Sequence, residues 1–293
     1  MPITNFDKVE LLLPMTGENN GTAFTDYSLR QRVVTRFDAV TSTAQSKFSA
    51  YGSSGRFVGN LDRLSVAESL DLGSSDFFIG GYIRPDSISG FQNVIAKRLG
   101  FDYGPFSFAL DSGKCRLRMS TDGSEWDIDV TANTTLSVDT WHHIAFTREG
   151  TSIKIYVDGV LDMTAQTLSG ELMTNTSAIW IGSQSNAVSP FSGYMQDWVI
   201  FKDTPFYTAN FTPPSRMVQR EITRVNTGTD SHVYDRAVLF DWNAGGNSVS
   251  HAVTPDSSGD FVVDDLIDLE YGVALIKDGC APICRGPISV DPD

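Results

Sequence analysis

The sequence has few histidines and cysteines and no long apolar run. No stretch of its 293 residues approaches the length of a membrane-spanning helix, and the start "MPITNFDKVELLLP" carries charges where a signal peptide needs an apolar core. We therefore expect synthesis in a cytoplasm and no insertion into a membrane. Of three cysteines, Cys115 stands alone, while Cys280 and Cys284 form a C-x-x-x-C pair. Free thiols, a disulfide or a cross-link to a neighbour all remain open for that pair.

Several motifs that carry chemistry are also missing. The chain has no G-x-S-x-G elbow, no P-loop, no dinucleotide-binding glycine pattern and no H-E-x-x-H. Positive charge is scarce too: 22 Lys and Arg stand against 36 Asp and Glu, which gives a net charge of −14. Such an acidic surface repels phosphate backbones, so we expect no nucleic acid among the partners.

What the sequence has in abundance is short strand-like runs. They recur about every eight to twelve residues between Gly-, Ser- and Asp-rich turns, as in a β-sandwich or barrel. In "DFFIGGYIRP" (76–85), alternate residues share a face, and in "SIKIYV" (152–157) Ile153, Ile155 and Val157 do the same. Asp158-Gly159 predicts a two-residue hairpin turn after the second run. The predicted fold class is all-β.

The chain divides into two predicted domains. Three prolines in "TPFYTANFTPPSR" break the strand pattern, and the acidic charge is concentrated beyond them. Residues 225–293 hold eleven Asp and one Glu against three basic residues, a net of −9 out of −14. We predict a first domain of residues 1–219 and a small acidic β-sandwich of residues 220–293. Four strand-like runs (235–242, 248–254, 260–266 and 271–277) make up the second domain.

A family resemblance rests on "WHHIAFTREGTSIKIYVDGV". This stretch resembles a laminin-G-like, concanavalin A-like jelly-roll domain. The shared positions are Trp141, His143, Ala145, Gly150, Tyr156, Val157, Asp158 and Gly159. The resemblance extends over most of residues 6–214. The opening "LLLPM…FTD.S" and the ending "YTANFTPP" look most like the version found in virion proteins of tailed bacteriophages.

Residues 224–290 resemble a second, transthyretin-like or carboxypeptidase-regulatory-like β-sandwich. This match rests on Thr254, Asp256, Gly259 and Phe261 in a T-x-D-x-x-G-x-F turn and on "EYGVAL". Together the two resemblances imply a non-catalytic structural protein of the virion, as a tail fibre, a tail-associated adhesin or a capsid decoration. Its expected partners are other virion proteins and host-surface glycans. A homo-oligomer is expected because so small a second sandwich gains stability when a partner covers it.

Two groups of residues suggest enzymatic chemistry at first sight. His142 and His143 are adjacent in one predicted strand and point to opposite faces, so they do not share one metal ion or form an active site. In "SEWDIDV", Glu125, Asp127 and Asp129 alternate, which resembles the catalytic strand of laminarinase-type glucanases. An ordinary strand with its carboxylates in water explains the pattern better. The alternative functions are a glycan-degrading enzyme and a bacterial surface lectin or adhesin.

Two binding sites remain as expectations. The resemblance implies a calcium site at the rim of the sandwich, and Asp26 and Asp197 stand at the matching motif positions. Gln196 replaces a residue that is commonly Asp in the family. For glycans, half-exposed aromatic rings provide flat stacking surfaces, and the candidates are Tyr103, Trp126 and Tyr207.

Overall fold

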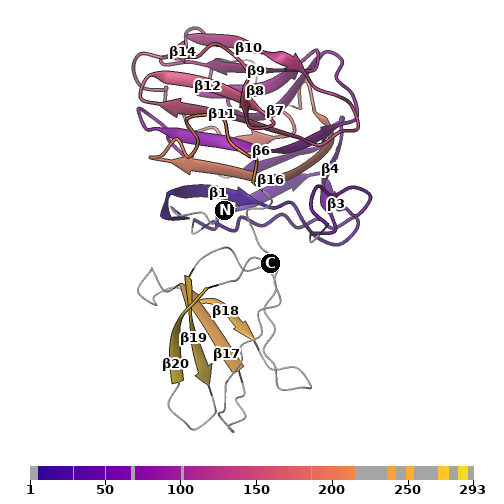
Figure 1. The fold of residues 1–293 in the computed structure, drawn as a ribbon. Helices are drawn as coiled ribbons and strands as arrows, with labels where there is room; N and C mark the ends of the chain where they lie inside the picture. The colour runs from indigo at the N-terminus through magenta and orange to yellow at the C-terminus, as the bar shows by residue number, and fades with distance from the viewer. Residues whose placement is uncertain are drawn as a thin grey trace. The chain divides into compact units, whose positions relative to one another are not determined.

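The structure is a computed structural model. It describes residues 6–28, 30–49, 51–66, 70–99, 102–185, 187–214, 236–241, 249–253, 270–276 and 283–289. The chain forms two compact units, Asn5–Ser215 and Arg216–Asp293 with Met1–Thr4. In the described residues of the first unit, a three-residue 3-10 helix, η1 (Phe6–Lys8), is followed by strands only, which confirms the all-β class (Figure 1). No described helix has the length and apolarity needed to span a membrane.

The first unit is a sandwich of two antiparallel sheets. Sheet A has nine strands in the order β13-β12-β11-β6-β16-β4-β3, with β1 beside β16 and β14 beside β12. Its strands are β1 (Val9–Leu13), β3 (Val40–Ser42), β4 (Ser54–Val58), β6 (Phe77–Pro85), β11 (His142–Glu149), β12 (Ser152–Val157), β13 (Val160–Leu161), β14 (Gln166–Thr167) and β16 (Ser192–Lys202).

Sheet B has seven strands in the order β10-β9-β8-β7-β15-β5-β2. Its strands are β2 (Val34–Phe37), β5 (Arg63–Val66), β7 (Phe91–Lys97), β8 (Phe106–Asp111), β9 (Lys114–Met119), β10 (Ile128–Thr135) and β15 (Ile179–Ile181).

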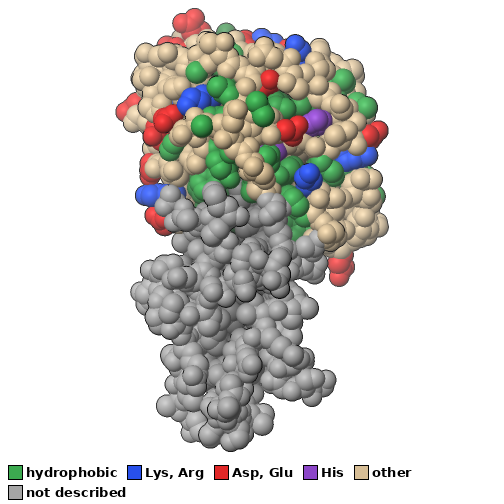
Figure 2. Space-filling view, viewed as in Figure 1, with side chains coloured by type: hydrophobic (Ala, Val, Ile, Leu, Met, Phe, Trp, Pro, Cys, Tyr) green, Lys and Arg blue, Asp and Glu red, His purple; other side chains and the backbone are tan. Residues whose placement is uncertain are grey.

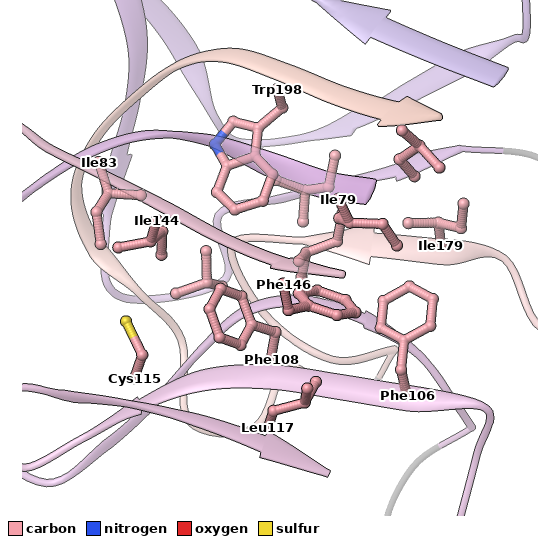
Figure 3. Close-up of a cluster of buried hydrophobic side chains, with 14 of the residues drawn as sticks. Ile79, Ile83, Phe106, Phe108, Cys115, Leu117, Ile144, Phe146, Ile179 and Trp198 are labelled. Atoms are coloured by element: carbon pink, nitrogen blue, oxygen red, sulfur yellow. The ribbon is translucent and has the colours of Figure 1, made fainter. Parts of the chain in front are cut away.

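The core lies between the two sheets (Figure 3). Alternation along each strand sends every second side chain inward, so Phe77, Ile79 and Ile83 of β6 are fully buried, as the sequence predicts. Between Ile79 and Ile83 the inward position is Gly81. A Cβ there would come within 2.6 Å of the Trp198 ring, so the missing side chain makes room for the largest residue of the core.

The predicted hairpin after β12 is confirmed. β12 pairs with β13 across Asp158 and Gly159, whose φ angles are 49° and 78°. Both values are in the left-handed region, which Asp and Gly tolerate and which a type I′ turn requires. Gly159 also has no space for a side chain, because a Cβ would meet the carbonyl oxygen of Phe211 at 2.0 Å.

The outer face of sheet A, which points away from the core, is covered by the chain's own residues. We call residues 203–214 the covering segment. Its rings pack on outward residues of β6 and β11, with Tyr207 5.4 Å from Phe78 and Phe211 5.6 Å from His143 between ring centroids. The hydroxyl of Tyr82 donates to the carbonyl of Pro214. As a result the outward Phe78, Tyr82 and His143 are at most 4% exposed.

The outer face of sheet B has a different character. Cross-strand register places one outward residue from each of its seven strands in a single row: Asp129, Arg118, Ser107, Ala96, Trp180, Ser65 and Thr35. The small residues Ser107 and Ala96 occupy the middle of the row, the charged residues lie at the β10 end, and Trp180 separates the middle from Ser65 and Thr35 at the β2 end. None of these seven residues belongs to the hydrophobic core between the sheets.

The described part of the second unit is one antiparallel sheet in the order β18-β17-β19-β20. Its strands are β17 (Arg236–Asp241), β18 (Val249–Val253), β19 (Glu270–Ile276) and β20 (Ile283–Ser289). Three of the four predicted runs coincide with β17, β18 and β19, whereas the run 260–266 lies outside the described residues. β20, which contains Cys284, was not among the predicted runs. Cys280 and the motif residues Thr254, Asp256, Gly259 and Phe261 are also outside the described residues.

Candidate functional site

Two of the three aromatic residues proposed for glycan binding come together at one end of sheet B. Tyr103 lies in the β7–β8 connection and Trp126 just before β10, and their rings meet edge to face with centroids 5.2 Å apart. Tyr103 is 39% exposed and Trp126 is partly exposed. Aromatic rings that are fixed and partly open to water provide the surfaces on which sugar rings stack.

An arginine completes this aromatic cluster. Arg98, which directly follows β7, places its guanidinium 5.3 Å from the centroid of the Trp126 ring. The residue is only 5% exposed, and its Nε has no hydrogen-bond partner among the described residues. Gly104 lies against it, since a Cβ there would come 2.6 Å from the Arg98 Cβ. We call Arg98, Tyr103 and Trp126 the aromatic–arginine site.

The charge of Arg98 is destabilised where it lies. Burial lowers the pKa of Arg98 below its ordinary value, the positive charge of Arg118 lowers it further, and Asp102 acts in the opposite direction. Desolvation of a cation has this effect because a charge is less stable away from water. Among the described residues, no carboxylate forms an ion pair with the Arg98 guanidinium, since the nearby ion pairs belong to Arg116 and Arg118.

Tyr207, the third candidate, lies on the other sheet. It belongs to the covering segment, where its ring stacks on Phe211 at 3.8 Å and meets Phe78 edge to face. Burial raises the pKa of its hydroxyl. Tyr207 therefore packs over the outer face of sheet A and is separate from the aromatic–arginine site.

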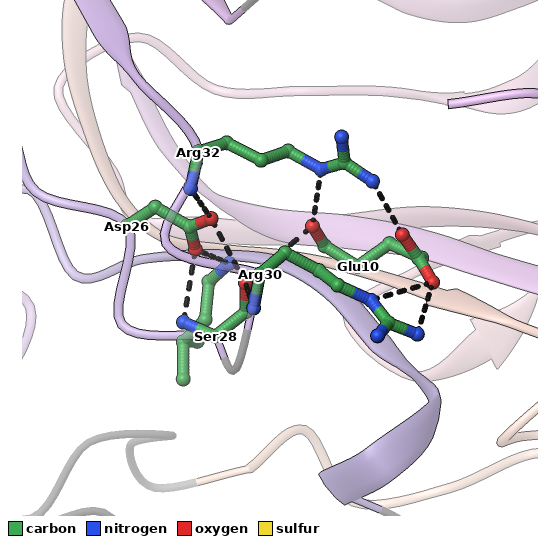
Figure 4. Close-up of polar contacts among 6 residues, drawn as sticks. Glu10, Asp26, Ser28, Arg30 and Arg32 are labelled. Carbon is green, nitrogen blue, oxygen red and sulfur yellow. Dashed lines mark hydrogen bonds and ion pairs between the residues drawn. The ribbon is translucent and has the colours of Figure 1, made fainter. Parts of the chain in front are cut away.

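The two candidate calcium ligands take part in hydrogen bonds that organise loops. Asp26 is 4% exposed, and its carboxylate accepts from the backbone N–H groups of Leu12, Ser28 and Arg32 and from the Ser28 hydroxyl (Figure 4). Beside it, Glu10 forms ion pairs with Arg30 and Arg32. These hydrogen bonds and ion pairs hold the loop after β1 against that strand.

Asp197 accepts a hydrogen bond from the Tyr51 hydroxyl at 3.0 Å. The neighbouring Gln196 bonds the backbone of Lys47 and Ser53 through both ends of its amide. Among the described residues, no group of three or more His, Cys, Asp or Glu is arranged to hold a metal ion. Because the oxygens of Asp26 already accept four hydrogen bonds, its surroundings do not fit calcium, and we assign no role to that ion.

The carboxylates of "SEWDIDV" do not form one continuous strand face. β10 begins only at Ile128, so the expectation that Glu125, Asp127 and Asp129 share a strand is wrong. Asp127 instead accepts from the backbone N–H and hydroxyl of Thr121, which folds the preceding segment back. This local turn was concealed by an alternation that also fits a strand.

Asp129 is held by two arginines. Arg116 donates to both of its oxygens, at 2.7 and 2.8 Å, and Arg118 donates at 3.3 Å. Burial would raise the pKa of Asp129, but the hydrogen bonds and charges of the two arginines outweigh it and lower the pKa. A general acid needs a raised pKa, so Asp129 is poorly suited to that role.

Neither histidine of the adjacent pair has a free ring positioned for catalysis. The ring of His142 contacts Asp158 at 2.8 Å through Nδ1 and accepts from the backbone N–H of Ser137 through Nε2. His143 is buried under the covering segment, where burial lowers its pKa to about 3. The two rings leave the strand on opposite faces, as the alternation predicts.

The two-sheet architecture is that of a lectin-like β-sandwich. A family model described as the concanavalin A-like lectin/glucanases superfamily, of the laminin-G type, matches residues 38–205. The match covers more than half of the chain, which therefore belongs to this family. No curated protein matches the chain.

Solved structures with the same fold include one domain of an arabinanase and two binding domains. Domain 4 of the arabinanase AbnA from Geobacillus stearothermophilus, solved with arabinotriose, is 13% identical, with a TM-score of 0.50 over 67% of this chain and 92% of that one. The binding domain of Paraclostridial mosquitocidal protein 1 is 12% identical, with a TM-score of 0.53 over 94% and 73%. The receptor-binding domain of the botulinum neurotoxin C/D mosaic serotype is 11% identical, with a TM-score of 0.51 over 93% and 72%.

Proposed function

We propose that this protein is a non-catalytic component of a bacteriophage virion that binds host-surface glycans at the aromatic–arginine site. The observation that carries the binding function is the meeting of Tyr103 and Trp126 beside Arg98. An edge-to-face aromatic pair fixes both rings, so little side-chain entropy is lost when a sugar stacks on them. The arginine adds hydrogen-bond donors that orient a sugar at the rings.

The state of the acidic residues favours binding over cleavage. Retaining glycoside hydrolysis needs two carboxyl groups about 5 to 5.5 Å apart, one of which donates a proton. Asp129 is bound to Arg116 and Arg118, and Glu125 lies in an exposed bend before the strand begins. Domain 4 of the arabinanase, which was solved with a sugar, supports the proposal by analogy.

The virion assignment rests on the resemblance of the segments around residues 10–28 and 207–214 to phage versions of the family. We propose that the second, acidic unit joins the protein to other virion proteins or to further copies of itself. Locating the polypeptide by imaging an intact phage particle tests this assignment and gives the copy number. Glycan binding without association with any particle would instead favour a bacterial lectin or adhesin.

The binding function is tested with single substitutions. We expect Trp126→Ala and Tyr103→Ala each to weaken binding to bacterial surface polysaccharides about tenfold, the equivalent of roughly 1.4 kcal/mol, because a stacking surface is lost. Tyr194→Ala is the matched control, since Tyr194 lies over Arg56 on sheet A with its ring 4.6 Å from the guanidinium. Equal weakening by all three would refute the site. Release of sugar products that Glu125→Gln abolishes would refute the non-catalytic assignment.

A further inference from the structure

The aromatic–arginine site contains a largely buried positive charge that forms no ion pair with the described residues; the Trp126 ring and the charge of Asp102 are what attract it. Arg98 is only 5% exposed, and its Nε has no hydrogen-bond partner. An ionised group that is removed from water without a partner is costly to the folded protein. A ligand that brings a negative charge to Arg98 would recover part of that cost, whereas a neutral ligand would not.

A second arginine beside Arg98 is also only weakly neutralised. Arg118 reaches Asp129 at 3.3 Å, but both oxygens of this carboxylate are already bonded more closely by Arg116. Arg116 in addition binds Asp111 at 2.7 Å. Asp129 is therefore mainly paired with Arg116, and Asp102 is the carboxylate whose charge acts on Arg98. The guanidinium of Arg118 lies over Phe91, 5.0 Å from the ring centroid, and its positive charge acts on Arg98.

From this arrangement we infer that the glycan bound at the site is acidic and that its anionic group, a carboxylate or a sulfate, is received by Arg98, with Arg118 adding positive charge nearby. This inference rests on the proposed glycan-binding function and names the ligand class for the same site. A guanidinium presents its N–H groups in a planar fork that matches two oxygens of one anionic group. With the anion on Arg98, the sugar ring that carries it lies within reach of Tyr103 and Trp126.

The net charge of −14 opposes an acidic ligand only at long range. Figure 2 shows acidic and basic side chains interspersed over the face of the first unit that is in view. Exposed charges are screened beyond about 10 Å at 0.1 M salt, whereas a contact with a largely buried guanidinium is screened much less. Binding of an acidic glycan is therefore expected to persist at physiological salt.

The test compares each acidic polysaccharide with its neutral form. Hyaluronan, alginate and polygalacturonate are paired with their carboxyl-reduced products, dextran sulfate is paired with dextran, and binding to the full-length protein is measured by calorimetry. We expect at least one acidic member to bind about tenfold or more tightly than its neutral partner. The carboxylate and sulfate pairs show which of the two groups is recognised.

Two substitutions assign the effect to the arginines. Arg98→Lys keeps a charge but loses the fork, and Arg118→Gln removes a charge; each should reduce the preference for the acidic form severalfold. Arg63→Gln is the matched control, because Arg63 also lies over aromatic rings of sheet B, 4.2 Å from the centroid of Phe37, and also has an unpartnered Nε. Arg118→Gln and the wild-type comparison remain informative if Arg98→Lys does not fold.

The outcomes separate the two proposals. Equal affinity for acidic and neutral forms, or binding of neutral glycans only, would overturn the inference and leave glycan binding intact. A preference for acidic glycans that Arg63→Gln reduces as strongly as Arg118→Gln would also overturn it. If neither acidic nor neutral glycans bind, the proposed function itself fails.

Discussion

The burial of His143 makes the first unit sensitive to acid. Its ring is 1% exposed and is surrounded by Phe78, Tyr82 and Phe211, and its Nδ1 has no partner. Burial lowers its pKa from 6.5 to about 3; Asp158 acts against this shift and Lys47 adds to it. The native protein therefore keeps this imidazole neutral down to about pH 3.

The unfolded chain behaves differently, because an exposed histidine has a pKa of about 6.5. As the pH falls below 6.5 the unfolded chain binds a proton that the native protein does not bind, so the unfolded state is stabilised. The free energy of unfolding should decrease by about 3 kcal/mol between pH 7.5 and pH 4.5 from this residue alone. Asp129 and Asp158, whose pKa values are lowered, affect stability mainly below about pH 4.

The assay is urea unfolding of the full chain, followed by tryptophan fluorescence, at several pH values from 7.5 to 4.5. His143→Phe keeps an aromatic ring and removes the titrating group, so its stability should depend on pH less steeply than that of the wild type, by about 3 kcal/mol over this range. His142→Gln is the control. Its free energy of unfolding should keep the pH dependence that His143 causes in the wild type. Parallel pH profiles for the wild type and His143→Phe would refute the assignment of a buried neutral imidazole.

Two further predictions concern stability. Asp26→Ala should lower the free energy of unfolding by about 3 kcal/mol, because three buried or half-buried backbone N–H groups lose their acceptor; a change below about 1 kcal/mol in urea unfolding would contradict this. Gly81→Ala should cost about 1 to 3 kcal/mol, since its Cβ would lie 2.6 Å from the Trp198 ring. A thermal midpoint equal to that of the wild type would show that the core yields without cost.

Local patterns in the sequence were sufficient for the fold class and for individual strands. Alternation assigned the inward faces of β6 and β12, and Asp158-Gly159 located the turn, because both signals depend on neighbouring residues only. Alternation failed at Glu125, where the side chain of Asp127 bonds Thr121 and makes a turn. A polar side chain that bonds the backbone in place of strand pairing fits the same alternating pattern as a strand residue, so the sequence alone does not reveal the turn.

The site could be predicted only in part. The search for half-exposed aromatic residues drew attention to Tyr103 and Trp126, but nothing in the sequence distinguished Arg98 and Arg118 from other arginines. Their relation depends on the order β10-β9-β8-β7 and on the register that sets Arg118 opposite Ser107 and Asp129. The lack of an ion pair for Arg98 is likewise a property of tertiary packing, because it depends on where the nearby carboxylates lie.

The two outer faces of the sandwich explain why the candidate site belongs to sheet B. On sheet A, aromatic side chains point outward from Phe78 to Tyr156, but Phe206, Tyr207 and Phe211 of the covering segment already pack on them. A ligand there would have to displace the protein's own rings. On sheet B, the outward row has small residues at its centre, and Tyr103, whose ring meets Trp126, remains 39% exposed. Tyr103 and Trp126, beside Arg98, therefore form an aromatic surface near sheet B that is open to a sugar.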